Sequence, residues 1–94
     1  HVRFHSRLVL TDAGWRLNSF EAIYEKDSVQ PVNPDDTLPL DWTMVNAMRP
    51  TYRLLAACDT SRGHDVSQDL LGDDRPDVLE AFYLAERRWV ATAE

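Results

Sequence analysis

Cysteine and glycine are both scarce in this chain. Its 94 residues include one cysteine and three glycines. Cys58 has no partner for an internal disulfide, which fits a reducing compartment, and no paired-cysteine site is present. No glycine-rich phosphate loop and no Ser-His-Asp spacing occurs either, so we expect no cofactor. Because Cys58 lies in an apolar stretch, we interpret it as a small buried side chain rather than a nucleophile.

Excess positive charge and long apolar runs are also missing. The net charge is -6, and no basic cluster offers the face that nucleic-acid binding requires. No apolar run approaches membrane-spanning length, and no signal-peptide pattern opens the chain. We therefore expect a soluble, cytoplasmic protein with no nucleic-acid partner and no membrane partner.

The acidic excess lies entirely in the second part of the chain. Residues 1–31 hold four basic and four acidic side chains, whereas residues 32–94 hold six basic and twelve acidic ones. A loop rich in proline, asparagine and aspartate separates the two parts near Pro31. The length allows one domain at most, and a chain that begins with His rather than Met is expected to be an excerpt or a processed form.

Apolar and polar residues alternate through the first 24 positions. From Val2 to Leu10 an apolar residue recurs at nearly every second place, which is the period of a β-strand. Turn residues follow at 11–14, where Gly14 is free to take a positive φ, and a second alternating run extends to Tyr24. We predict an antiparallel hairpin of residues 2–10 and 15–24.

One face of this hairpin is predicted to be apolar. A turn over residues 11–14 gives the cross-strand partners Leu10 with Trp15, Leu8 with Leu17, Ser6 with Ser19, Phe4 with Glu21 and Val2 with Ile23. A bulge at Gly14 would shift these partners. Since an isolated two-stranded ribbon is marginal in water, we expect the hairpin to belong to a larger curved sheet. A missing upstream segment or a second chain would complete that sheet, and we expect a homodimer.

Helical signals fill the second part. Asp41 can cap a short helix that ends at Pro50, and Pro50 can begin a second helix to about Ser61. The inner side of the second helix is predicted to carry Tyr52, Leu55 and Cys58. Residues 74–77 combine a cap, an early proline and an acidic first turn, and they predict a helix over 75–91 that buries Phe82 and Trp89. The predicted fold class is α+β, with a helical C-terminal extension after the hairpin.

The run Leu8-Val9-Leu10-Thr11, the turn Asp12-Ala13-Gly14 and the return Trp15-Arg16-Leu17 resemble the closing hairpin of SnoaL-like proteins, within the nuclear-transport-factor-2-like superfamily. The resemblance covers the first third of the chain. It implies a strongly curved sheet that forms a cone around a pocket, with residues 1–32 as the closing hairpin and residues 33–94 as a loop and helical extension. The early helices and strands, where several members carry catalytic Asp or His, have no counterpart here.

Glu21 is the candidate catalytic residue. It falls among apolar residues on the face expected to be covered, where burial raises the pKa of a carboxyl group and makes it a general acid or base. The alternative is that Glu21 faces water at a strand end or a bulge. The candidate ligand-binding residues around this position are Phe4, Ser6, Trp15, Ser19 and His5.

The histidines and arginines near the start allow further readings. Arg3, His5 and Arg7 share the mixed face with Tyr24. They would either hold an anion or carry acid/base chemistry, or they would simply form a solvated or interface surface. His1 and His5 are about 13 Å apart at ~3.3 Å per strand residue, too far to share one metal ion at ~2 Å. We therefore expect no metal site.

Two functions remain open at this point. The resemblance implies a pocket domain that binds a small apolar molecule, with cofactor-independent acid/base isomerisation, cyclisation or dehydration as its reaction. The alternative is a non-catalytic scaffold or assembly subunit, in which the hairpin completes a sheet and the acidic helical part mediates assembly.

Overall fold

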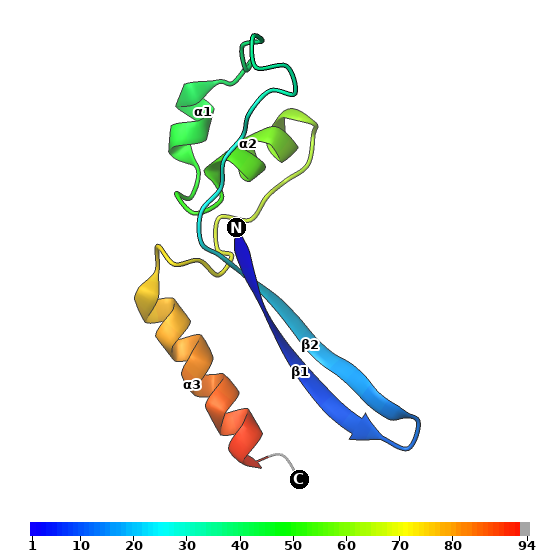
Figure 1. Cartoon of the computed structure of the whole chain (residues 1–94). Helices are drawn as coiled ribbons and strands as arrows, with labels where there is room; N and C mark the ends of the chain where they lie inside the picture. The colour runs from blue at the N-terminus through cyan, green and yellow to red at the C-terminus, as the bar shows by residue number, and fades with distance from the viewer. Residues whose placement is uncertain (93–94) are drawn as a thin grey trace.

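The chain forms a β-hairpin followed by three helices, in a computed structural model that describes residues 1–92. The hairpin consists of β1 (Val2–Thr11) and β2 (Gly14–Tyr24), and the helices are α1 (Trp42–Ala47), α2 (Arg53–Ser61) and α3 (Pro76–Thr92). In Figure 1, α1 and α2 lie beyond the end of the hairpin where the chain begins, and α3 runs beside the hairpin. The predicted α+β class, with the hairpin first and a long helix last, is confirmed.

The hairpin turn follows the chemistry of its residues. Thr11 pairs with Gly14, which has a φ of +102°, and the Thr11 hydroxyl donates a hydrogen bond to the Gly14 carbonyl at 2.8 Å. Two predicted cross-strand pairs are confirmed, Leu10 with Trp15 and Leu8 with Leu17. The turn therefore sets the register over the half of the hairpin nearest to it.

A bulge changes the register beyond Leu8. Arg7 pairs with Ser19 while Leu8 pairs with Leu17, so Asn18 is left without a partner. The expected pairs of Ser6 with Ser19, Phe4 with Glu21 and Val2 with Ile23 are wrong. The observed partners are Ser6 with Phe20, Phe4 with Ala22 and Val2 with Tyr24. One extra residue moves every later side chain of β2 to the opposite face.

The base of β2 has a further backbone partner. The Tyr24 amide donates to the Leu71 carbonyl at 2.9 Å, and the Asp73 amide donates to the Tyr24 carbonyl at 2.9 Å. These two bonds form a parallel bridge between Tyr24 and Gly72. Among residues 1–92 the sheet has two strands only, so the outer edge of β1 has no neighbouring strand there. The larger curved sheet stays a prediction.

Residues 41–74, with α1 and α2, form a unit that we call the helical head. The Asp41 carboxylate caps α1 by accepting hydrogen bonds from the amides of Thr43 and Met44, as predicted. The buried apolar side chains of the helical head are Val45, Tyr52, Ala56 and Ala57, and the Tyr52 ring packs against Tyr24 at the base of β2 with a centroid distance of 4.9 Å.

The second helix differs from its prediction at its start and on its inner side. It begins at Arg53, and Pro50 lies in the preceding turn. Leu55 is 46% exposed and Cys58 is half-buried, whereas Ala56 and Ala57 are buried. Small side chains on the inner side allow α1 and α2 to pack closely, and this close packing turns the larger Leu55 outward.

Arg49, in the connection between α1 and α2, binds the loop that precedes α3. Its guanidinium group is 7% exposed and donates two hydrogen bonds of 2.6 Å to the Asp74 carboxylate. It also donates to the carbonyls of Gln68 and Leu70 at 2.7 and 3.1 Å, while the Thr51 hydroxyl donates to Asp74 at 3.0 Å. The Arg49 hydrogen bonds lower the pKa of Asp74 to about 2.

The last helix has the predicted extent but buries a different stripe. Leu79 and Glu86 are its buried residues, while Phe82 and Trp89 are half-buried. The prediction that Phe82 and Trp89 are buried is therefore wrong. The reason is the partner surface: α3 packs against the hairpin face that carries Arg3, His5 and Arg7, and long polar side chains fill the space between helix and strands.

The molecule is elongated. Its extents are 55 × 32 × 24 Å and its radius of gyration is 17.5 Å, whereas a compact domain of this length would have a radius of gyration of about 12 Å. The free end of the hairpin projects away from the helical head in Figure 1. Much of the hairpin is therefore left without cover from the described chain.

Candidate functional site

The hairpin face turned away from α3 carries seven of the large apolar side chains that are exposed among residues 1–92. We call it the apolar face, and its large members are Val2, Phe4, Leu8, Leu10, Trp15, Leu17 and Phe20. Their exposed fractions run from 38% to 67%. The rings of Phe4 and Phe20 pack against each other at a centroid distance of 4.9 Å. The bulge creates this contact, because it brings Phe20 onto the face of Phe4.

The predicted site residues are divided between the two faces. Phe4, Ser6 and Trp15 lie on the apolar face, as the alternation predicts. Ser19 pairs with Arg7, and Glu21 pairs directly with His5, so both lie on the α3 side. Glu21 is exposed rather than surrounded by apolar residues. The placement expected for Ser19 and Glu21 is wrong, and the six residues do not line one cavity.

The opposite face of the hairpin is joined to α3 by ion pairs. Arg7 donates hydrogen bonds of 2.7 and 2.9 Å to the two carboxylate oxygens of Glu86, and its guanidinium carbon lies 4.7 Å from the centre of the Trp89 ring. These hydrogen bonds lower the pKa of Glu86 and raise the pKa of Arg7. The two-point geometry fixes the position of α3 along the hairpin.

His5 shares the same carboxylate. Its Nε2 atom lies 3.4 Å from Glu86 Oε2, and its ring meets the Phe82 ring edge to face at 5.2 Å. A groove of about 260 Å³ opens beside His5, lined also by Tyr83, Glu86, Arg87 and Val90. A histidine beside a carboxylate is typical of acid/base sites. Here, however, Glu86 already neutralises Arg7, so its main role is to hold α3 on the hairpin.

Arg3 forms a second connection nearer the helical head. Its guanidinium group donates to both Asp73 oxygens at 3.1 and 2.8 Å, lies 3.1 Å from a Glu25 oxygen, and donates to the Tyr83 hydroxyl at 3.3 Å. The Asp73 hydrogen bond is the main cause that raises the pKa of Arg3. The basic stripe therefore forms an internal interface, which was one of its two predicted readings.

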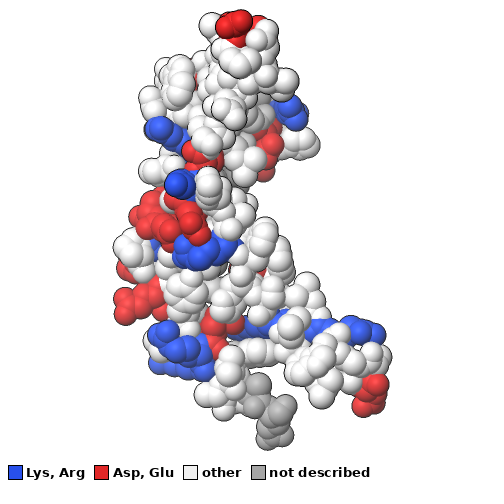
Figure 2. Space-filling model, viewed as in Figure 1, with Lys and Arg blue, Asp and Glu red and all other residues white. Residues whose placement is uncertain are grey.

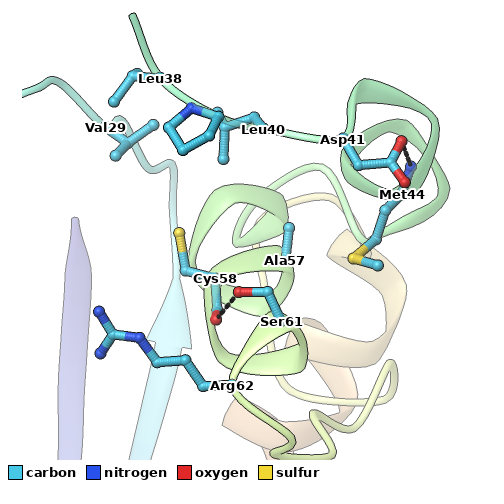
Figure 3. A pocket seen from close by; sticks show the side chains of 10 residues that line it. Val29, Leu38, Leu40, Asp41, Met44, Ala57, Cys58, Ser61 and Arg62 are labelled. Atoms are coloured by element: carbon cyan, nitrogen blue, oxygen red, sulfur yellow. Dashed lines mark hydrogen bonds between the residues drawn. The ribbon is translucent and has the colours of Figure 1, made fainter. Parts of the chain in front are cut away.

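A small cavity lies between the loop before α1 and the helices of the head (Figure 3). Its volume is about 270 Å³, and mostly apolar side chains line it, including Val29, Leu38, Met44 and Cys58. The polar groups at the cavity are engaged locally, since Asp41 caps α1 and the Ser61 hydroxyl donates to the Cys58 carbonyl. At the lower limit of ligand-pocket volumes, this cavity is too small to define a site alone.

Glu86 and Asp73 are the functional partners that the sequence reasoning missed. Glu86 follows Leu79 and Phe82 at helical spacing, so its place inside an apolar stripe was the available signal. Within residues 1–92, no three His, Cys, Asp or Glu side chains converge as metal ligands would. None of the described helices combines the length and the apolar composition needed to span a membrane.

Comparison with protein-family models, with curated proteins and with solved structures finds no match to this chain. The resemblance to SnoaL-like proteins therefore rests on the hairpin residues alone, and the geometry of the two hairpin faces carries the functional argument.

Proposed function

We propose that this chain is a non-catalytic assembly module whose apolar face is a protein–protein interface. The observation that carries the proposal is the continuous exposure of seven large apolar side chains on one face of the hairpin. A fully exposed aromatic side chain presents on the order of 150–250 Å², and a Leu or Val presents somewhat less, so the face offers on the order of 600–1,000 Å². That area exceeds the largest apolar patch of a typical monomer and matches one side of a standard interface, about 800 Å².

The apolar face is uncovered because α3 packs on the opposite, basic face of the hairpin. α3 covers the basic side, where Arg3 and Arg7 find carboxylate partners. No described helix crosses the other side, so burial of Phe4, Leu17 and Trp15 requires a surface from outside residues 1–92. The partner we propose is a second copy of the chain, which gives a homodimer. We also propose a cytoplasmic location, because a single cysteine suits a reducing compartment.

Sedimentation velocity over a range of concentrations tests this function. Leu17→Glu puts a carboxylate in the middle of the apolar face and is expected to abolish association, since burying an unpaired charge is costly. Val32→Glu adds the same charge at a fully exposed loop position and should leave association unchanged. A wild-type chain that is monomeric at every concentration and as soluble as Leu17→Glu would contradict the proposal.

A SnoaL-like pocket domain that binds a small apolar molecule is the second candidate. It is favoured by the position of Phe4, Ser6 and Trp15 on one face, which further strands beside β1 would enclose. Glu21 lies on the opposite side, next to His5, so acid/base isomerisation, cyclisation or dehydration by Glu21 would require a ligand that binds on the α3 side instead. A monomeric chain that binds one molecule of an apolar fluorescent probe saturably would favour this candidate over assembly.

A further inference from the structure

We infer that two copies of this chain pack their apolar faces together in an antiparallel, two-fold arrangement, with the turn of each hairpin over the base of the other. This inference rests on the proposed assembly function and adds the geometry of the partner. Its first support is charge. No ionisable side chain belongs to the apolar face on β1, and the bulge moves Glu21 to the other side. Two copies can therefore meet without bringing like charges into contact.

The charge of the remaining chain selects the antiparallel orientation. Residues 32–94 hold twelve acidic and six basic side chains, so the net charge of -6 lies entirely in the helical part. In Figure 2 the hairpin that projects to the lower right is mainly white and blue, with a red group at its far end, and most red atoms lie over the rest of the molecule. A parallel pair would bring two acidic helical heads side by side. An antiparallel pair separates the heads by about the length of a hairpin, well beyond the ~8 Å screening length at physiological salt.

α3 does not obstruct this arrangement. The Arg7–Glu86 ion pair and the hydrogen bond from Arg3 to the Tyr83 hydroxyl hold α3 on the opposite side of the hairpin. The apolar face is therefore open from the turn down to Phe4, and only at its base does Tyr24 pack against Tyr52 of the helical head.

Electron spin resonance distances between labels at the two hairpin turns test the orientation. Asp12→Cys, made in a Cys58→Ala background, carries one spin label at the exposed turn. With a strand rise of ~3.3 Å per residue, the antiparallel dimer predicts a distance above about 30 Å between labels, whereas a parallel dimer predicts less than about 20 Å. Adding Leu17→Glu to the labelled chain should weaken dimerisation on the order of 100-fold and remove the dipolar signal.

The outcomes separate this inference from the function on which it rests. A discrete dimer with one long distance supports the antiparallel pair. Short distances, or an open-ended polymer that Leu17→Glu still dissolves, would overturn the geometry while leaving the apolar face as an assembly surface. Loss of the signal in a labelled Val32→Glu chain would show that charge alone disperses the dimer and would overturn the inference.

Discussion

The helical head and the hairpin differ in where they keep their apolar side chains. In the head, Val45, Tyr52 and Ala56 are buried, and Arg49 makes its ion pair at 7% exposure. On the hairpin, large apolar side chains face outward, and the contact with α3 includes the Arg7–Glu86 ion pair and a hydrogen bond from Arg3 to Tyr83. The head is thus organised as a small folded core, whereas the hairpin exposes an apolar face, which we propose to be half of an interface. Three substitutions and one change of pH test this difference between the two regions.

Arg49→Ala is expected to have the largest effect on stability. It removes two of the hydrogen bonds to the Asp74 carboxylate, which keeps the one from Thr51, and it removes the Arg49 donor from two loop carbonyls. Losing one partner of a buried ion pair costs about 3–5 kcal/mol. Arg53→Ala is a matched control, because Arg53 is exposed and makes one long 3.5 Å contact with Asn46. Thermal unfolding should show a melting temperature lowered by at least about 12 °C for Arg49→Ala and nearly unchanged for the control. Equal effects of the two variants would contradict the role of Arg49.

Gly72→Ala tests the same network by adding one methyl group. A Cβ atom at this position would lie 2.6 Å from both Asp74 Oδ1 and Thr51 Oγ1. Because Arg49 holds Asp74 in place, the carboxylate cannot move aside without losing its own hydrogen bonds. We expect a loss of about 1–3 kcal/mol in the free energy of unfolding, measured by urea denaturation. An unchanged free energy of unfolding would show that Asp74 and Thr51 can move aside for the added methyl group.

Acid should weaken the head through Asp74. Its pKa is lowered from 3.8 to about 2 in the folded state, mainly by the hydrogen bonds from Arg49. A group with a lowered folded-state pKa stabilises the fold above its unfolded pKa and loses that contribution as the pH falls through the folded value. The melting temperature of the wild type should therefore fall between pH 3.8 and pH 2 more steeply than that of Asp74→Asn. Parallel curves for the two proteins would argue against this assignment.

Glu86→Gln is expected to have the smallest effect. It removes the charge that Arg7 and His5 share, so α3 should loosen on the hairpin while the head keeps its stability. Hydrogen exchange should become faster in the second half of α3 and stay unchanged in α2. Glu80→Gln, at an exposed position of the same helix, is the control. Faster exchange in α2 would show that the two regions are coupled.

Periodicity predicted the elements of this fold because local signals specify them. The alternation over residues 2–10, the turn at Gly14 and the cap at Asp41 each depend on neighbouring residues, and each is confirmed. The bulge at Asn18 is different, because alternation continues on both sides of it and only the observed pairing shows the shift. That single residue moves Glu21 from the apolar face to the α3 side.

The burial pattern could not be predicted from periodicity for a related reason. An apolar stripe indicates that a face is covered, but it does not identify the surface that covers it. Phe82 and Trp89 are half-buried because α3 meets the basic side of the hairpin. The candidate catalytic role of Glu21 and the ligand-binding roles of Phe4, Ser6, Trp15, Ser19 and His5 stay predictions.

Hydrogen exchange at two protein concentrations tests most directly whether the hairpin is half of an interface. One sample should be dilute enough to be monomeric by sedimentation and the other concentrated enough to be associated. We predict that the amides of β1 and β2 exchange more slowly in the concentrated sample, while the amides of α2 exchange at the same rate in both. Hairpin amides that exchange equally fast in the two samples would contradict the account.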